Sequence, residues 1–151
     1  LTGSGYKHYE ISNYALPNYQ SLHNKNYWNK TPYLGVGPSA HSYNGKSRQW
    51  NVRNNAVYCS KINKNELFYD IEILTNKDII NEYILTNLRT FSGLDLNYIS
   101  DCINPNEYLQ FTNELSKLET SGFLTTKDNV TYLNDKGMLF ADSISSQLFL
   151  I

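Results

Sequence analysis

The distribution of apolar residues along the chain changes character near residue 75. Before this point, short runs alternate between apolar and polar residues and are separated by turn-forming residues, which is typical of short strands and loops. After it, apolar residues recur every three or four positions, as in amphipathic helices. The pattern predicts an α+β protein. Short strands are expected at residues 6–12, 33–37 and 48–52, a short helix or turn at residues 22–29, and a short helix at residues 56–62.

The clearest helix signals lie in the second half of the chain. Thr75-Asn76-Lys77-Asp78 has the form of a capping box, in which side chains satisfy free backbone N–H groups at a helix start. Asn104-Pro105-Asn106-Glu107 combines a cap residue, a proline in the first turn and an acid at the third position. Gly122 is the expected end of this second helix. The buried stripes are expected to be Ile80, Tyr83, Ile84, Asn87 and Leu88 in the first helix, and Tyr108, Phe111, Leu115 and Leu118 in the second.

A hairpin and a last helix complete the second half. Residues 123–126 and 130–133 are two β-prone runs around a turn at residues 127–129. The order helix, helix, hairpin, helix predicts a winged-helix-like domain over residues 75–151. Residues 1–74 do not close a domain by themselves and indicate the end of a larger α/β unit. The last helix, residues 135–150, is expected to bury Leu139, Phe140, Ile144 and Leu148.

Composition excludes several classes of protein. With 40 % hydrophobic and 18 % charged residues, the chain can bury a core and is not of the disordered type. Its net charge of −1 gives no bulk attraction to nucleic acid or to an anionic membrane. No apolar run approaches the ~18 residues of a membrane span, and the first residues do not form a signal peptide. We expect a cytoplasmic protein, and its start without Met suggests a piece of a longer chain.

The predicted helix before the hairpin argues against DNA recognition. Its one basic residue, Lys117, faces an excess of acids at Glu107, Glu114 and Glu119. A protein that neutralises ~6–10 phosphates needs many more cationic side chains on one face. We therefore expect no nucleic-acid partner, and the domain is better interpreted as a structural or docking cap.

The two cysteines, Cys59 and Cys102, stand far apart and lack the CxxC spacing. Two thiols cannot hold an iron–sulfur cluster, which needs three or four thiolates. Reduced, structural cysteines of a cytosolic protein are the simplest interpretation.

The segment "HNKNYW" gathers unusual chemistry in six residues. His23 and Tyr27 are four residues apart, so a helix would place them on one face. A neutral imidazole at His23 could ligate haem iron, Asn24 could support the ring or a propionate, and Trp28 could lie against the macrocycle. The alternative from chemistry alone is a solvent-facing or core helix in which Tyr27 and Trp28 simply pack and His23 forms a hydrogen bond with the backbone.

The segment "GVGPSAHS" predicts a strand that runs into a turn of small residues. Gly35 and Gly37 could bring backbone N–H groups to a nucleoside or a carboxylate, with His41 nearby. A lone GxG is weak evidence and does not indicate a Rossmann site. Glu10 needs a partner if it is buried; Arg48 and Arg53 are candidates for this, and equally for gripping a propionate.

Six blocks in this order carry a family resemblance over nearly the whole chain. They are "GYKHYEISNYA", "HNKNYW", "YLGVGPSAHSY", "RQWNV", "LTNLRTFSGLDL" and "GFLTTKDNVTYLNDKGMLFADSI". Together they resemble the carboxy-terminal part of the radical-SAM proteins known as oxygen-independent coproporphyrinogen III oxidase-like (HemN/HemW). More specifically, they resemble the HemW branch of this family, whose members act as haem chaperones and bind haem through a His-Asn-x-x-Tyr-Trp motif.

The resemblance implies roles for particular residues. The haem motif matches at His23, which would be the axial ligand to iron, and at Asn24, Tyr27 and Trp28. The glycine segment matches a family segment beside the S-adenosylmethionine pocket. The positions implied there are Gly35, Gly37, Ala40 and His41.

The resemblance also implies what this chain lacks. The family's CxxxCxxC loop for a [4Fe–4S] cluster and most of its partial (β/α) barrel are absent. Residues 1–74 would be the end of that barrel and residues 75–151 a winged-helix-like cap. Alone, the fragment should hold no cluster, bind S-adenosylmethionine poorly and be catalytically inactive.

Three functions follow for the longer protein. It could be a chaperone that passes haem to an acceptor protein, an oxygen-independent oxidase of coproporphyrinogen III, or a non-catalytic module that docks a partner such as an electron donor. The motif at residues 23–28 favours the chaperone, because the oxidases lack it.

Overall fold

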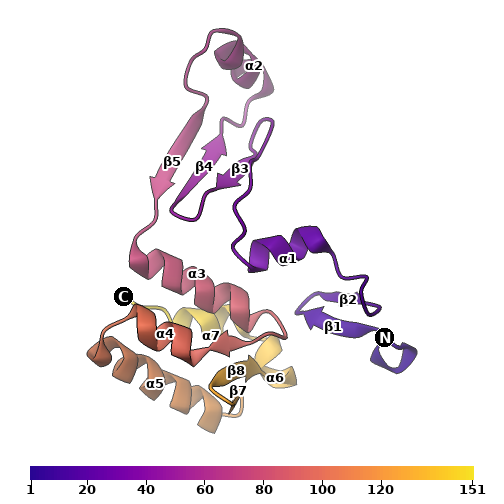
Figure 1. Cartoon of the computed structure of the whole chain (residues 1–151), viewed down its shortest axis with the longest axis vertical. Helices are drawn as coiled ribbons and strands as arrows, with labels where there is room; N and C mark the ends of the chain where they lie inside the picture. Colours follow the sequence, from indigo (N-terminus) through magenta and orange to yellow (C-terminus); the bar gives the residue numbers. More distant parts are fainter. The chain divides into compact units, whose positions relative to one another are not determined.

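The computed structural model of the chain describes residues 1–151, which form two compact units. The first unit combines residues 1–28 with residues 76–151, and the second consists of residues 29–75. Figure 1 shows both, with helices and strands labelled in chain order. These units do not coincide with the two predicted domains, a barrel end at residues 1–74 and a winged-helix-like domain at residues 75–151. The two domains stay a prediction.

The first unit begins with a small hairpin and a short helix. A 3-10 turn, η1 (Thr2–Ser4), is followed by β1 (Lys7–Glu10), β2 (Asn13–Ala15) and α1 (Leu22–Trp28). The strand predicted at residues 6–12 is confirmed, and the predicted helix or turn at residues 22–29 is a helix. The end of β1 also pairs with the segment after α3 (Asn76–Leu88): Glu10 forms an antiparallel bridge with Thr90, and the Ile11 N–H donates to the Arg89 carbonyl at 2.9 Å. This pairing places residues 1–28 in the same unit as the second half of the chain.

Glu10 is buried, with only 2 % of its surface exposed. Its carboxylate accepts hydrogen bonds from the Ser12 backbone N–H at 3.1 Å and from the Asn13 side-chain amide. Buried carboxylates need such partners. The partners come from the turn of the same hairpin, rather than from the two arginines proposed from the sequence.

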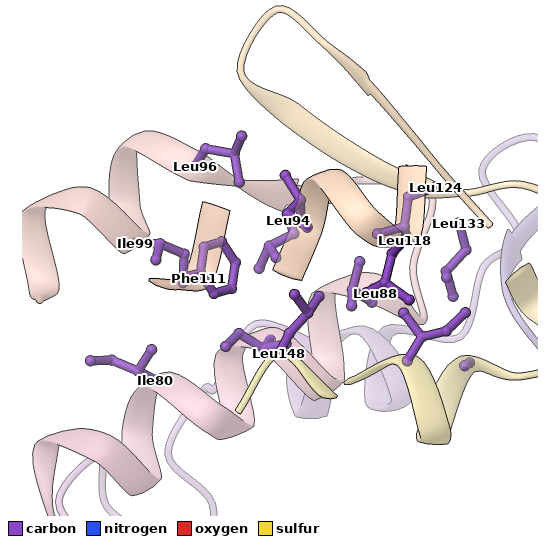
Figure 2. Close-up of a cluster of buried hydrophobic side chains, with 14 residues drawn as sticks. Ile80, Leu88, Leu94, Leu96, Ile99, Phe111, Leu118, Leu124, Leu133 and Leu148 are labelled. Atoms are coloured by element: carbon purple, nitrogen blue, oxygen red, sulfur yellow. The ribbon is translucent and has the colours of Figure 1, made fainter. Parts of the chain in front are cut away.

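The remainder of the first unit surrounds one hydrophobic core. A three-stranded antiparallel sheet with the order β6-β8-β7 packs with the helices. Figure 2 shows the core side chains converging from α3, from the sheet and from the helices that follow. After α3 the elements are β6 (Leu94–Asp95), α4 (Leu96–Cys102), α5 (Pro105–Thr120), β7 (Leu124–Lys127), β8 (Val130–Leu133), α6 (Asp135–Met138) and α7 (Ala141–Gln147).

Helix α5 and the hairpin form as the sequence predicts, because their signals are local. Asn104 accepts from the N–H groups of Asn106 and Glu107, and Glu107 bonds back to the Asn104 N–H, which completes a capping box. Gly122 follows the helix with φ of +72°. In the hairpin, Asp128 and Asn129 both have positive φ, as a two-residue turn requires.

Two short elements of the second half are missing from the sequence prediction, as are strands β2, β3 (His41–Tyr43) and β5 (Tyr69–Ile73). The two are β6 and α4, which occupy residues 94–102, between the two predicted helices. Asp95 caps α4 by accepting from the Asn97 N–H at 2.9 Å. Leu94 and Ile99 are fully buried. Elements of two and seven residues are too short to show a period, so only this Asp cap could have indicated them.

The predicted helix over residues 135–150 is broken, and part of its predicted core is wrong. Phe140 lies between α6 and α7 with φ of −123° and ψ of 21°. Leu139 and Phe140 are 80 % and 52 % exposed, whereas Ile144 and Leu148 are buried as predicted. The buried stripe instead starts with small residues, Gly137 and Ala141, which allow the backbone to approach the sheet. An expectation based on side-chain size favours Leu139 and Phe140 over these small residues and is therefore wrong for the first half of the predicted helix.

The second unit is a three-stranded antiparallel sheet with the order β3-β4-β5 and one helix. Its elements are β3 (His41–Tyr43), β4 (Ser47–Asn51), α2 (Asn55–Asn63) and β5 (Tyr69–Ile73). The strand and helix predicted at residues 48–52 and 56–62 are confirmed. The strand predicted at residues 33–37 is wrong: only Tyr33 forms a bridge, to Tyr43. None of the helices of either unit is long and apolar enough to cross a membrane.

Candidate functional site

Helix α1 carries the "HNKNYW" segment. Ser21 precedes the helix and accepts a hydrogen bond from the Asn24 N–H through its side-chain hydroxyl, at 3.2 Å. A serine in this position satisfies N–H groups that a short helix cannot satisfy itself. The four-residue spacing brings the rings of His23 and Tyr27 together edge to face, with 4.9 Å between their centroids and 89° between their planes. The predicted shared face is therefore confirmed for these two side chains.

The imidazole of His23 is exposed, and Tyr27 is 44 % exposed. Helix α1 has no buried residue at all. A helix whose aromatic residues lie in a hydrophobic core does not fit this exposure, whereas the other alternative, a solvent-facing helix, does. An exposed imidazole beside a partly exposed phenol ring can accept a flat ligand from outside.

Trp28 is half-buried, and its indole Nε1 is inaccessible to solvent without a hydrogen-bond acceptor. A buried donor without an acceptor costs about 1–3 kcal/mol. Because the atom is inaccessible, an acceptor from outside could reach this N–H only if the indole changes its position. Asn24, on the same helix, is half-buried.

The glycine loop lies in the second unit, and its backbone donors have partners. The Gly35 N–H donates to the Ser42 hydroxyl at 3.0 Å, and the Gly37 N–H donates to the Tyr58 hydroxyl at 3.2 Å. The side-chain amide of Asn51 donates to the Gly37 carbonyl at 2.9 Å. The backbone of this loop is therefore hydrogen-bonded to side chains instead of to a neighbouring strand, which explains why residues 33–37 are irregular. A ligand that uses either N–H would have to displace a hydroxyl.

Both glycines are required by the backbone. A Cβ on Gly35 would lie 2.1 Å from the His41 carbonyl oxygen, and Gly37 has φ of +103°, which side chains rarely tolerate. The Ala40 N–H donates to the Gly37 carbonyl at 3.3 Å, which closes the turn. His41 is exposed on β3, opposite Trp50 on β4.

Asn51 is a residue of this loop that the sequence analysis does not identify. It is 1 % exposed, its N–H donates to the Ala40 carbonyl at 2.9 Å, and its side chain binds the glycine segment. The signal that could have identified Asn51 is its place as a polar residue near the end of the strand predicted at residues 48–52. The predicted site residues thus form two groups: residues 23–28 in the first unit, and residues 35–41 in the second.

The chain does not provide ligands for an iron–sulfur cluster. Cys59 and Cys102 are both free and exposed, and they belong to different units. No three His, Cys, Asp or Glu side chains are grouped so that they could hold a metal ion. A [4Fe–4S] cluster needs Cys ligands that are not in this sequence.

Comparison with known proteins agrees with the sequence resemblance. No family model matches the chain. A protein of Buchnera aphidicola subsp. Schizaphis graminum named "Heme chaperone HemW" is 32 % identical over 95 % of the chain, and the HemW of Lactococcus lactis is 27 % identical over 99 %. The chain spans only 38 % and 39 % of the lengths of these relatives.

A solved structure shows the same fold. It is the Escherichia coli coproporphyrinogen III oxidase HemN, described as a radical SAM enzyme. It superposes with a TM-score of 0.75 at 20 % identity, over 99 % of this chain and 38 % of its own. The fold is therefore that of the C-terminal region of a radical-SAM oxidase. The sequence similarity is more specific: the chain belongs to the coproporphyrinogen III oxidase-like radical-SAM family, in its HemW branch.

Proposed function

We propose that this chain is the haem-binding part of a haem chaperone, and that haem is its cargo. The observation that carries the proposal is the exposed imidazole of His23 on α1, in contact with Tyr27. Haem iron accepts the lone pair of a neutral imidazole nitrogen. His23 would be the axial ligand, and because it is exposed, haem could enter and leave without unfolding the core.

The other three motif residues, Asn24, Tyr27 and Trp28, would contact the porphyrin rather than the iron. The ring of Tyr27, held edge-on to His23, would contact the macrocycle, as would the indole of Trp28. The Trp28 N–H is unpartnered but inaccessible, so it would donate to a haem propionate only after the indole turns toward the ligand. Asn24 would support the ring or a propionate from the same helix.

We further propose that the glycine loop adjoins the S-adenosylmethionine pocket of a longer protein. Gly35, Gly37, Ala40 and His41 would contribute, and their shape is held by Asn51, Ser42 and Tyr58. The [4Fe–4S] cluster of that protein would be bound elsewhere in it, because this chain offers no suitable cysteines. In this proposal the chain alone performs no radical chemistry.

The C-terminal elements are proposed to be a winged-helix-like cap, and residues 1–74 the end of a radical-SAM barrel. The charges of α5 support a role in docking rather than in DNA binding, because Lys117 is bound to Glu114 at 2.5 Å. A haem-acceptor protein and an electron donor are the proposed partners. The proposed location is the cytoplasm.

Haem titration followed by absorbance tests the proposal. We expect the His23→Ala chain to bind haem at least tenfold more weakly than the unmodified chain, with a shifted Soret band, because the iron has lost a nitrogen ligand. His8→Gln is the matched control. The His8 ring bonds to the Ile11 carbonyl at 3.1 Å, and the glutamine amide keeps a donor for that bond. Equal affinities and spectra for the His23→Ala and unmodified chains would contradict the proposal.

A further inference from the structure

A cleft in the first unit has no role in haem binding as proposed above. It consists of two adjoining hollows, of about 230 and 370 Å³, which share the side chains of Ile11, Arg89 and Met138. The smaller hollow has an apolar floor of Leu88 and Leu133. We call this the Arg89 cleft. It is formed where the ends of β1 and α3 meet β8 and α6, elements that Figure 1 labels.

The rim of the Arg89 cleft exposes three large apolar side chains. Phe91, Leu139 and Phe140 are 48 %, 80 % and 52 % exposed, and each lines one of the two hollows. The break between α6 and α7 is what directs Leu139 and Phe140 outward. Grouped apolar side chains around a hollow are typical of an interaction site, whereas single exposed ones are not.

One cation lies between the two hollows. The Arg89 side chain is 25 % exposed, and its guanidinium binds the carboxylate of Asp142 at 2.5 Å. Asp142 is 79 % exposed, so its side of the ion pair is solvated and its attraction to Arg89 is screened by salt. A carboxylate from another molecule could therefore replace Asp142 at little cost, and it would gain the bidentate geometry that arginine offers.

The dimensions of the cleft indicate the kind of occupant. Small-molecule pockets usually measure ~300–1,000 Å³, and the apolar hollow is smaller, which suits a single bulky side chain. The exposed rim continues beyond it over Leu139 and Phe140. We propose that the Arg89 cleft binds a segment of a partner protein that inserts one aromatic side chain into the small hollow and presents an adjacent carboxylate to Arg89.

The probe for this proposal is a short peptide, acetyl-Gly-Phe-Asp-Gly-amide, added to the haem-free 151-residue chain. Binding is followed by amide chemical shifts. We expect saturable shifts at the residues of the cleft, and at least tenfold weaker binding by the Arg89→Gln chain. Arg53→Gln, an exposed arginine of the second unit, is the matched control and should not change the affinity. Because no haem is present, the result is independent of the haem proposal.

Two further variants separate a binding role of these residues from a structural one. Asp142→Asn removes the competing carboxylate and should tighten peptide binding about two- to fivefold, whereas Leu139→Ser should weaken it. The absence of shifts at millimolar peptide, or equal binding by the Arg89→Gln chain, would overturn the proposal. So would equally tight binding of 3-phenylpropionate, which would indicate a small-molecule site. Self-association of the chain that Leu139→Ser abolishes would indicate a second copy as the occupant and would also overturn it.

Discussion

Two side-chain polar atoms of this protein are buried without a hydrogen-bond partner, and they have different explanations. One is the indole Nε1 of Trp28, on the helix that carries His23. The other is the hydroxyl of Ser145, which is fully buried on α7 among the core residues. The first lies on the helix of a candidate ligand site, where a ligand can supply the missing acceptor once the indole moves to expose its N–H. The second lies in a closed core and can only reduce stability.

Replacing the core serine should therefore stabilise the protein. We expect Ser145→Ala to raise the free energy of unfolding by about 1 kcal/mol, because an unpaired hydroxyl is no longer desolvated. Urea denaturation measures this. Ser146→Ala is the matched control: Ser146 is exposed on the same helix, and its hydroxyl donates to the Asp142 carbonyl at 2.8 Å. Both variants gain the same helix propensity from alanine. The unfolding free energy of the Ser146→Ala chain should therefore change by no more than about 0.5 kcal/mol. A lower stability of the Ser145→Ala chain would contradict this account.

At the residue scale, the sequence predicts what depends on neighbours along the chain. The contact of His23 with Tyr27 follows from a four-residue spacing on a helix. The partners of the glycine loop could not be predicted, because Tyr58 is 21 residues and Asn51 14 residues from Gly37. Such pairings are set by the tertiary fold and leave no local signal.

Among the elements, α6 shows how a close approach overrides helix propensity. Gly137 lies inside this helix, where alanine would ordinarily be about 1 kcal/mol more stable. A Cβ at this position would lie 2.1 Å from the Phe123 carbonyl oxygen, so the helix and the start of the sheet could not keep their present distance. The glycine is therefore a packing requirement.

Gly137→Ala is expected to lower the free energy of unfolding by about 1–3 kcal/mol, in the range measured for overpacked cores. Thermal or urea denaturation gives the value. Gly3→Ala is the matched control, because no atom lies within 4 Å of a Cβ built there. If the Gly137→Ala chain were as stable as the Gly3→Ala chain, the packing explanation would be wrong.

Elements with strong local signals were predictable, and short or tertiary-dependent ones were not. The capping box of α5 and the turn of the β7–β8 hairpin are encoded within four residues each. The approach of Gly137 to Phe123, by contrast, joins two elements of the fold and leaves no local signal. The sequence pattern likewise predicts Leu139 and Phe140 in the core, although they are exposed and form part of the rim of the Arg89 cleft.

For the molecule as a whole, the buried apolar side chains are unevenly distributed. The core cluster belongs entirely to the first unit, with residues from α3 to α7. In the second unit, the buried apolar side chains are Tyr43 and Leu74. Since burial of apolar surface is the main favourable term in folding, the second unit should be the less stable of the two by itself.

Hydrogen exchange provides a direct comparison of the two units. Strands β4 and β8 are each the central strand of a three-stranded antiparallel sheet, so their amides are matched in hydrogen bonding. We expect the amides of β4 to exchange on the order of tenfold or more faster than those of β8, through local opening of the second unit. Equal protection of the two strands would show that the second unit opens only with the core.

Whether the imidazole of His23 ligates haem iron can be decided by chemical rescue. The His23→Gly chain is mixed with haem, with or without free imidazole, and the absorption spectrum of the haem that co-elutes with protein in gel filtration is recorded. The account predicts that the variant retains little haem alone, and that imidazole restores both the retained haem and the Soret band of the unmodified chain. If the variant without imidazole retained as much haem with an unchanged spectrum, another residue would be the ligand and the account would be contradicted.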